Sequence, residues 1–342
     1  MKALLLLFLV LIVVQEALMD NGIEEVVVKT EDLLGQIEKT LGLDKLLGSI
    51  NSDVGWNMSF HDYQSFLTGY GPDNFKFLAV IDKATGKAVS CMYGTKLSRE
   101  GGSPPVFSIG MYYTHPDYRT GGLGLGRRLF DEWANFANGG NRFLTSVPEM
   151  AEKYAERSGF DKSAPWQLMY MGAKAKDCDI SQLFSDSTLT IVDFDGVAME
   201  KLDEYDRCIS GGIVRIHFLK KWLVQPEAYN KFAISPEGNI IGYCNARISH
   251  RNHVILGPFY AENAKIASTL LRRTLEEVPN FSQRTKLIAY GSSDNNNGLE
   301  LFKKMVGGEV DTELYPRMFT NEVVHSQGDK VYSFADSDTS LN

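Results

Sequence analysis

The order of apolar and polar positions in the first half of the chain predicts a mixture of strands and helices. Runs rich in β-branched and aromatic residues, bounded by polar turns, are typical of strands. Apolar residues spaced three and four positions apart indicate helices that bury one face. The predicted strands cover residues 23–29, 75–82, 88–97 and 106–114, and the predicted helices cover residues 30–41 and 59–67.

The fourth of these strands leads into a glycine-rich loop, THPDYRTGGLGLG, over residues 114–126. A helix with apolar Leu129, Trp133 and Phe136 on one face follows the loop. Beyond it the pattern predicts a strand, a short helix that ends at a glycine C-cap, and a last strand. These three elements cover residues 141–147, 148–158 and 166–172.

A similar order of elements returns in the second half of the chain. Pro258 follows Pro116 by 142 residues, and Ile288 follows Leu144 by 144 residues, so the halves form a diverged internal repeat. The predicted strands are 189–194, 232–234, 240–248, 253–260 and 285–290, and the predicted helices are 215–224, 264–278 and 298–305.

These patterns divide the chain into five segments. Residues 1–18 form a hydrophobic N-terminal segment, 22–175 a first domain, 176–187 a polar linker, 188–324 a second domain, and 325–342 a polar tail that we expect to be disordered. Two domains also fit the length of 342 residues.

The apolar run at residues 3–14 is too short to span a membrane as a helix, because twelve residues reach only about 18 Å against a core of about 30 Å. A secretory signal, an anchor on a membrane surface and a start at Met19 all stay open. Membrane association through residues 3–14 is therefore one expectation, beside a cytoplasmic location.

Charge and cysteine content narrow the class further. The chain has 35 Lys and Arg against 43 Asp and Glu, a net charge of −8, and so lacks the broad positive field of a non-specific nucleic-acid-binding protein. Its four cysteines are scattered singly, which argues against a zinc site or a disulfide scaffold. Cys91 and Cys244 fall in strand-like runs and are expected to be buried thiols.

The glycine-rich loop is the strongest functional signal. Glycines at the start of a helix leave backbone N–H groups uncovered, and the helix dipole favours an anion there. The loop lacks the Walker pattern and the dinucleotide fingerprint G-x-G-x-x-G, but it fits R-x-x-G-x-G at Arg119, Gly122 and Gly124. The alternative for the loop alone is a tight turn that needs positive φ.

Two motifs together resemble the GNAT superfamily of acyl-CoA-dependent N-acyltransferases. The matching residues of the phosphate loop are Thr114, Pro116, Tyr118, Arg119, Gly122 and Gly124. The matching residues of the later A-x-x-x-Y-x-x-x-G-F helix are Ala151, Gly159 and Phe160. The resemblance covers essentially the whole first half, and it implies an α+β fold with a mixed sheet and two tandem GNAT-like domains, the second degenerate.

The resemblance also implies where coenzyme A binds. The backbone of residues 119–124 would hold its pyrophosphate, and the main chain near residues 112–114 would pair with the pantetheine arm at a splayed strand edge. The implied cofactor-binding residues are Tyr112, Tyr113, Thr114, Arg119, Thr120, Gly121, Gly122, Leu123 and Gly124.

The catalytic residues depart from the family pattern. The tyrosine that often protonates the departing thiolate is replaced by Ala155, with Tyr154 one place earlier, about 100° around a helix. Tyr154 is our candidate acid, with a packing role as the alternative. The strand at 106–114 contains no carboxylate or His, so Glu149, or else His61, is our candidate base.

The second half resembles the C-terminal domain of YitH-type acetyltransferases, through GPFYA at residues 257–261 and PRMF at residues 316–319. Its loop has no glycines after Pro258, and Glu262 would oppose a phosphate. We expect this half to have lost or altered coenzyme binding and to complete the acceptor pocket.

The sequence therefore predicts an N-acyltransferase that moves an acetyl or other short acyl group from acetyl-CoA to a primary amine by direct attack, without a metal. The acyl length and the amine stay open, although residues 53, 56 and 57 are expected to border the acceptor. The alternative is an acyl-CoA-binding or scaffold protein without the chemistry. An acyl-CoA donor slightly favours a cytoplasmic protein.

Overall fold

The computed structural model describes residues 13–14, 26–27, 57–82, 87–119, 123–337 and 340–341. The helix predicted at 30–41 and the loop residues 53 and 56 lie outside these ranges. Of the hydrophobic N-terminal segment only the two-residue strand β1 (Val13–Val14) is described, and of the strand predicted at 23–29 only β2 (Val26–Val27). Within the described part of the chain, no helix has the length and apolar character that a membrane span requires.

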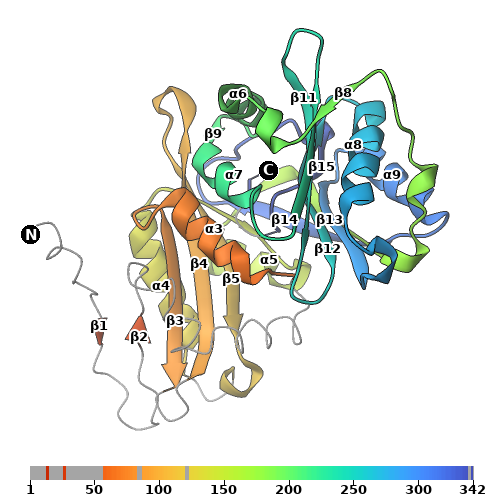
Figure 1. Cartoon of the computed structure of the whole chain (residues 1–342). Helices are drawn as coiled ribbons and strands as arrows, with labels where there is room; N and C mark the ends of the chain where they lie inside the picture. The colour runs from red at the N-terminus through yellow and green to blue at the C-terminus, as the bar shows by residue number, and fades with distance from the viewer. Residues whose placement is uncertain are drawn as a thin grey trace, which may run out of the picture.

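The first half, residues 57–175, contains three helices and five strands among the residues described (Figure 1). The helices are α3 (Phe60–Tyr70), α4 (Leu125–Ala137) and α5 (Ala151–Ser158). The strands are β3 (Phe75–Asp82), β4 (Lys87–Arg99), β5 (Val106–Thr114), β6 (Asn141–Thr145) and β7 (Lys162–Lys174).

The second half, residues 188–337, repeats this mixture. Its helices are α6 (Met199–Ile209), α7 (Ile216–Trp222), α8 (Ala264–Glu277) and α9 (Asn296–Val306). Its strands are β8 (Thr190–Val192), β9 (Ile213–Val214), β10 (Ala228–Ile234), β11 (Ile240–Ile248), β12 (Val254–Ala261), β13 (Lys286–Ser292), β14 (Asp311–Phe319) and β15 (Val331–Ser333).

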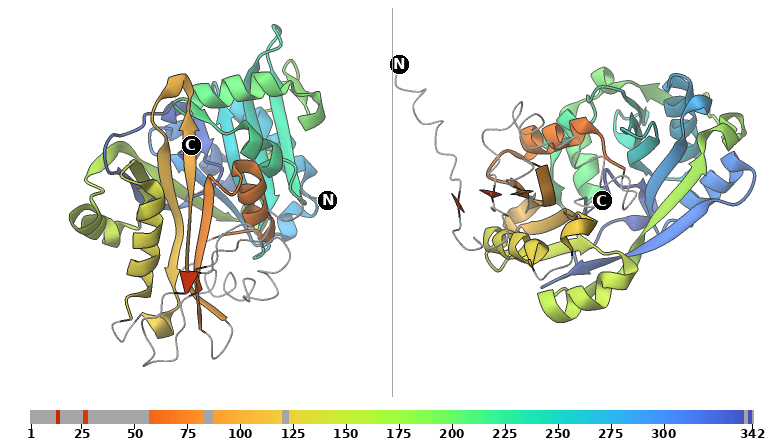
Figure 2. Two further views of the ribbon diagram at one scale, coloured as in Figure 1. Left: turned by 90° about the vertical axis from the view of Figure 1, so that its left-hand side faces the viewer. Right: turned by 90° about the horizontal axis from the view of Figure 1, so that it is seen from below.

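The two halves share one sheet by exchanging a strand. The strand order is β3-β4-β5-β6-β14-β7-β13-β12-β11-β10-β8, so β14 of the second half lies between β6 and β7 of the first, and β7 pairs with β13 of the second (Figure 2). Backbone groups that would otherwise lie on an open sheet edge are thereby paired. The predicted α+β fold with a mixed sheet is confirmed, and the exchange ties the two repeats into one unit.

The helix predicted from residue 59 is confirmed as α3. Ser59 is its N-cap and accepts a hydrogen bond from the backbone N–H of His61, while the Asp62 carboxylate accepts one from the N–H of Ser59 at 2.9 Å. This reciprocal arrangement is a capping box and stabilises the first turn.

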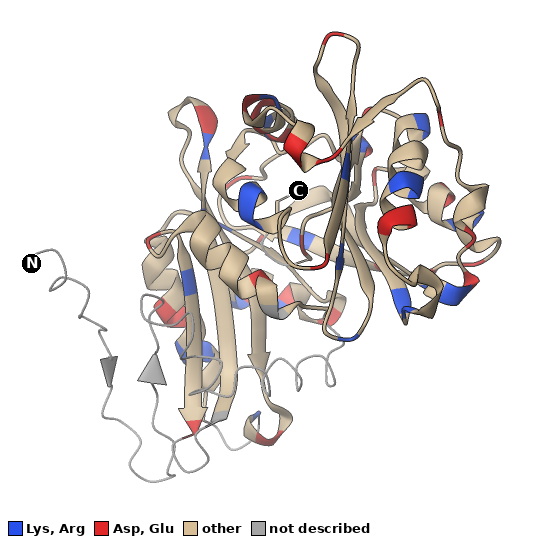
Figure 3. Cartoon of the chain, viewed as in Figure 1, with Lys and Arg blue, Asp and Glu red and all other residues tan. Residues whose placement is uncertain are grey.

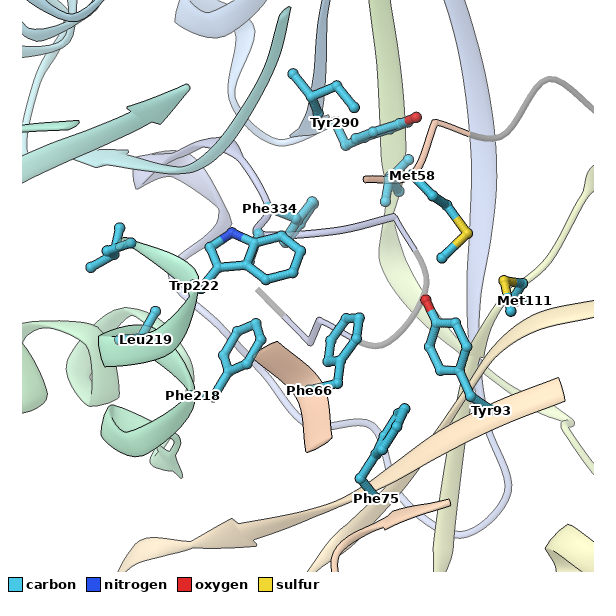
Figure 4. Close-up of a cluster of buried hydrophobic side chains, with 14 of the residues drawn as sticks. Met58, Phe66, Phe75, Tyr93, Met111, Phe218, Leu219, Trp222, Tyr290 and Phe334 are labelled. Atoms are coloured by element: carbon cyan, nitrogen blue, oxygen red, sulfur yellow. The ribbon is translucent and has the colours of Figure 1, made fainter. Parts of the chain in front are cut away.

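The largest apolar cluster joins the halves through α3 and α7 (Figure 4). The ring of Phe66 on α3 stacks on Phe218 of α7 at 5.4 Å and lies 5.5 Å from the ring of Trp222. All three side chains are almost fully buried, so each contributes on the order of 1.5–3 kcal/mol of burial energy to the interface between the halves. Cys91 and Cys244 are free and buried, as predicted.

A buried ion pair crosses the same interface between the halves. Both carboxylate oxygens of Asp62 on α3 accept hydrogen bonds of 2.9 Å from Arg247 on β11. The two side chains are 4% and 3% exposed, and the guanidinium lies 4.2 Å from the ring centroid of Trp222. The pair fixes the position of α3 against the second half.

The tail at 325–342 was expected to be disordered, and this prediction is wrong for the residues that are described. Val331–Ser333 form β15, and Phe334, Ala335 and Leu341 are buried. Disorder was expected because polar residues flank the short, mostly apolar run VYSFA. The run adds a strand to the sheet, so its burial outweighs the polarity of its neighbours.

A buried cation holds the tail in place. Arg317 on β14 lies between the rings of Phe143, Trp166 and Phe334, with centroid distances of 4.6, 4.8 and 4.5 Å, and donates a hydrogen bond to the carbonyl of Ser340. Burial lowers the pKa of Arg317 to about 9.

Candidate active site

A splay between the parallel strands β5 and β6 creates the first feature of the site. Their register pairs run from Val106↔Asn141 to Ile109↔Leu144. Past that point β5 has a bulge, because Met111 and Tyr112 lie opposite a single residue of β4, and Met111 has a φ of 49°. The bulge turns β5 away from β6.

A cavity of about 670 Å³ opens where the strands diverge, and we call it the cleft. Its lining comes from the two splayed strands, from α4 and α5 with the turn before α5, and from β14. The lining residues are Ile109, Gly110, Met111, Tyr112, Tyr113, Thr114, Arg119, Gly126, Leu144, Thr145, Val147, Glu149, Met150, Lys153, Tyr154, Glu313 and Tyr315.

The N-terminus of α4 borders the cleft. Gly124, the N-cap, is in the left-handed conformation (φ 63°) and accepts a bond from the Arg128 N–H at 3.1 Å, and no described side chain caps the helix. Gly126 in the first turn keeps the helix close to β5, since a Cβ there would lie 2.9 Å from the Tyr112 hydroxyl. The first N–H groups and the helix dipole therefore favour an anion at this end of the cleft.

The predicted cofactor-binding residues fall into three groups. Tyr112, Tyr113, Thr114 and Arg119 line the cleft. Leu123 packs against the apolar core under α4, and Gly124 is exposed at the helix start. Thr120, Gly121 and Gly122 lie outside the described residues.

Arg119 closes the loop onto the strand end. Its Nε donates to the carbonyl of Thr114 at 2.7 Å, and its guanidinium lies 5.5 Å from the ring centroid of Tyr113. Arg127, in the first turn of α4, forms an ion pair of 2.9 Å with Asp131 one turn later. Arg119 and Lys153 are the cationic side chains that line the cleft.

Both predicted catalytic side chains line the cleft. Tyr154 is half-buried on α5, its ring 6.3 Å from that of Phe160, and burial raises its pKa to about 12. The phenol is therefore protonated at neutral pH. Glu149 is exposed in the short turn (Pro148–Met150) before α5. His61, the alternative base, is exposed on α3 and does not line the cleft.

A second cavity of about 400 Å³ adjoins the cleft. The two share Thr145, Val147, Glu313 and Tyr315, and we call this set the junction. The second cavity also contains side chains from β7, β13 and β14 and from the segments before β12 and after β15. Its remaining lining residues are Asn57, Leu168, Tyr170, Arg251, His253, Thr285, Lys286, Ile288, Tyr290, Asp311 and Ser337.

Sequence reasoning missed Glu313 and Tyr315, because the strand that carries them was not predicted. The Tyr315 hydroxyl donates a hydrogen bond of 2.6 Å to the Glu313 carboxylate. Burial and this bond raise the pKa of Tyr315, so it stays protonated. The strand reaches the first half only through the exchange, and nothing local to residues 311–319 signals that.

The far end of the second cavity is basic. Burial, together with the positive charges of Arg251, Lys286 and His250, lowers the pKa of His253 to about 4. His253 is thus neutral at pH 7, and its Nδ1 lies 2.5 Å from Asn57 Oδ1. Lys286 lies 3.9 Å from Asp311, and both side chains are more than a third exposed. Elsewhere Lys, Arg, Asp and Glu are interspersed over both halves (Figure 3).

The second half has an equivalent splay between β12 and β13, and the tail fills it. Those strands pair in parallel at Val254↔Leu287 and Ile255↔Ile288, as β5 and β6 do. Beyond this, β15 pairs with β12, and the Phe334 N–H donates to the Tyr290 carbonyl on β13 at 2.8 Å. A Cβ on Gly257 would lie 1.8 Å from the Phe334 carbonyl oxygen. A peptide strand therefore occupies the space that the cleft leaves open in the first half.

Comparison with known proteins identifies the class. Residues 202–333 match the family described as acetyltransferase (GNAT) domain. The matched region includes β15, and hence part of the tail. No curated protein shows a significant match to the chain.

Solved structures extend the likeness to the whole chain. A putative acetyltransferase from Pyrococcus horikoshii has a TM-score of 0.62 at 13% identity, over 95% of this chain and 98% of that one. A tandem GNAT protein from the clavulanic acid biosynthesis pathway has a TM-score of 0.56 at 15% identity, over 82% and 94%. N-myristoyltransferase from Saccharomyces cerevisiae, with bound myristoyl-CoA and inhibitors, has a TM-score of 0.60 at 11% identity, over 93% and 87%.

The resemblance to the GNAT superfamily, drawn from the motifs of the first half, is confirmed by the family match in the second half and by the fold of both. At the level of this class the protein is an acyl-CoA-dependent N-acetyltransferase, and its co-substrate is a coenzyme A thioester.

Proposed function

We propose that the chain transfers an acetyl group from acetyl-CoA, bound in the cleft, to a primary amine held in the second cavity. The contiguity of the two cavities at the junction carries this proposal. The cleft offers a splayed strand edge, a helix N-terminus and Arg119 to the pantetheine and phosphates of the donor. The second cavity offers polar and aromatic side chains to a separate molecule, so donor and acceptor meet at residues 145, 147, 313 and 315.

The chemistry is direct attack. The amine enters as an ammonium ion and gives one proton to a carboxylate that borders the cleft, Glu149 or Glu313. The nitrogen then bonds to the thioester carbonyl carbon, the C–S bond breaks, and the thiolate takes a proton from the Tyr154 hydroxyl. The second proton of the nitrogen restores Tyr154 through solvent, so the products are an amide, a free thiol and one released proton.

The space beside Met111 favours a short acyl group. Behind this residue lies the aromatic cluster of Figure 4, where the space left between the described side chains is only about 10 Å³. That is at most room for one water. A long chain passing through the junction instead would fill the second cavity in place of the amine.

A product assay tests the proposal. Purified protein is incubated with acetyl-CoA and a panel of primary amines, and acetylated products are sought by mass spectrometry. We expect acetyl transfer, with kcat/KM for octanoyl-CoA about 10-fold or more lower, since overpacking a filled site costs about 1–3 kcal/mol. Tight donor binding with no product from any amine would instead support the acyl-CoA-binding alternative. Equal rates with both donors would contradict the assignment of acetyl.

A further inference from the structure

We infer that Glu313 is the catalytic base, and that it receives the acceptor as an alkylammonium ion. Tyr315, two residues along the same strand, acts through Glu313 as a positioning residue. The inference rests on the proposed function and deepens it, because it chooses between the two carboxylates that border the cleft. The second half of the chain thus supplies the base for a donor that the first half binds.

Strand β14 runs from the second cavity to the cleft, and alternate residues along it share one face. Asp311 lines the second cavity alone, whereas Glu313 and Tyr315 line both cavities. Two residues later, Arg317 lies opposite Thr145 of β6. Because residues two positions apart on a strand are separated by about 7 Å, this order sets Glu313 and Tyr315 at the place where donor and acceptor meet.

Of the four residues of the junction, Glu313 is the one that carries a carboxylate. Burial and the bond to Glu313 raise the pKa of Tyr315, so this hydroxyl stays protonated and does not compete as a base. Glu149 lies in the turn before α5 and borders the cleft alone, in the space assigned to the donor. An amine that arrives through the second cavity therefore reaches Glu313 first.

The Tyr315 hydroxyl orients the Glu313 carboxylate through their hydrogen bond of 2.6 Å. A carboxylate offers about four acceptor positions, so it can bind an ammonium ion while it keeps this bond. The nearest lysine of the second cavity, Lys286, lies 3.9 Å from Asp311, two residues before Glu313. The charge of Lys286 is thus directed at Asp311.

The wall beside Glu313 favours a cation. Glu313 lies opposite Tyr170 of β7, and Tyr170 lies opposite Tyr290 of β13. The ring centroids of the two tyrosines are 6.0 Å apart, and the faces of such rings attract an ammonium ion. Burial raises the pKa of Tyr170, and neighbouring acidic groups, Glu313 among them, raise it further. A carboxylate beside two phenol rings is a surface suited to a protonated alkylamine.

Glu313 enables attack by taking one proton from the bound ammonium ion. The free nitrogen then bonds to the carbonyl carbon of the thioester, the C–S bond breaks, and the thiolate takes the Tyr154 proton. The second nitrogen proton restores Tyr154 through solvent, and Glu313 passes its proton to water when the product leaves. One proton is released for each amide formed.

The range from about pH 6 to about pH 10 isolates this proton transfer, because an alkylammonium ion has a pKa of about 10, as lysine does. The raised pKa values of Tyr170 and Tyr315 keep both phenols protonated there, and His253, with a pKa of about 4, stays neutral. Groups that titrate alike in wild type and variant cancel in a ratio of their rates. The charged and titratable residues that line the walls around Glu313 also include Glu149, Lys153, Lys286, Tyr290 and Asp311.

Glu313→Gln tests the inference through the ratio of its kcat/KM to that of the wild type across this pH range. The probe is the alkylamine of the panel that the wild-type chain acetylates fastest. We expect a loss of about 50-fold near pH 7, where the amine is protonated and needs the base. Near pH 10, where solution supplies the free amine, the loss should shrink to less than about 3-fold.

The control is Glu309→Gln, an exposed residue before β14 that lines neither cavity, and its kcat/KM should change less than about 2-fold at every pH. Glu313 is itself exposed, so the amide should leave folding intact, and an unchanged affinity for acetyl-CoA checks this.

Tyr315→Phe tests the positioning role. We expect a loss of about 5-fold near pH 7 that also shrinks near pH 10, and a double variant Glu313→Gln/Tyr315→Phe no slower than Glu313→Gln alone. A loss that is the same at every pH, or that adds to the loss from Glu313→Gln, would show that Tyr315 does not act through Glu313.

The outcomes separate this inference from the proposed function. No loss in Glu313→Gln, a loss independent of pH, or a loss with the expected pH dependence in Glu149→Gln instead would overturn the inference and leave the enzyme intact. Acetylation of arylamines alone, which are neutral at pH 7, would overturn it as well. No acetylation of any amine by a protein that binds acetyl-CoA would overturn the proposed function itself.

Discussion

Replacing Tyr154 with phenylalanine is expected to lower kcat for acetyl transfer about 100-fold while leaving the affinity for acetyl-CoA unchanged. The ring would still pack 6.3 Å from Phe160, but the departing thiolate would lose its proton donor. Steady-state rates together with donor titration measure the two quantities separately.

The role of Tyr154 as the proton donor also predicts how the rate of acetyl transfer depends on pH. Burial raises the pKa of Tyr154 to about 12, so the hydroxyl stays protonated through the neutral and mildly alkaline range. The wild-type rate should therefore rise with pH as the acceptor and its carboxylate lose protons, and should not fall again below about pH 11.

A matched control is Tyr118→Phe. Tyr118 stands just before the glycine-rich loop and donates a 2.6 Å hydrogen bond to Asp82, but it does not line the cleft. Its loss should change kcat less than 2-fold. If Tyr154→Phe were as mild as Tyr118→Phe, Tyr154 would be only a packing residue, the alternative that the sequence left open.

Replacing Asp62 with alanine is expected to destabilise the protein by about 3–5 kcal/mol, because it leaves the Arg247 guanidinium buried without its carboxylate. Asp62 is 4% exposed and also completes the capping box of α3, which adds to the loss. Urea denaturation followed by circular dichroism measures the change in free energy of unfolding.

The double variant Asp62→Ala/Arg247→Met separates the ion pair from the cap. Removing both charges should recover some of the loss, since an apolar side chain beside Trp222 carries no uncompensated charge. A double variant less stable than Asp62→Ala alone would show that the stacking of Arg247 on Trp222 outweighs the pair.

The strand–loop–helix unit of the first half could be predicted because its signals are local. A nearly continuous apolar run marks β5, and Leu129 and Trp133 mark the buried face of α4. Gly124 then adopts the positive φ that the tight-turn alternative required, while the helix that it begins also borders the cleft. The two interpretations of the loop are thus compatible.

The exchanged strand could not be predicted in the same way. β14 contains Pro316 and several charged residues, so its composition does not favour a central strand. Its pairing with β6 and β7 depends on residues more than a hundred positions away. Glu313 was missed for this reason, and β15 was missed because only four apolar residues, Val331, Tyr332, Phe334 and Ala335, stand among polar ones.

The filled splay of the second half explains how the two halves of the repeat differ. In both halves a pair of parallel strands diverges in the same way, but β15 pairs with β12 where the cleft would lie. The half that the family match covers is therefore closed by its own tail, and the open cleft belongs to the half that carries the loop motif.

Calorimetric titration of acetyl-CoA into the full chain tests the central claim most directly. We expect one molecule bound per chain, with binding abolished by Gly126→Leu, whose side chain would collide with Tyr112, and retained by Gly308→Leu, where no described atom lies within 4 Å of the added Cβ. A stoichiometry of two, an absence of binding, or unchanged affinity in Gly126→Leu would contradict the assignment of the donor to the cleft between β5 and β6.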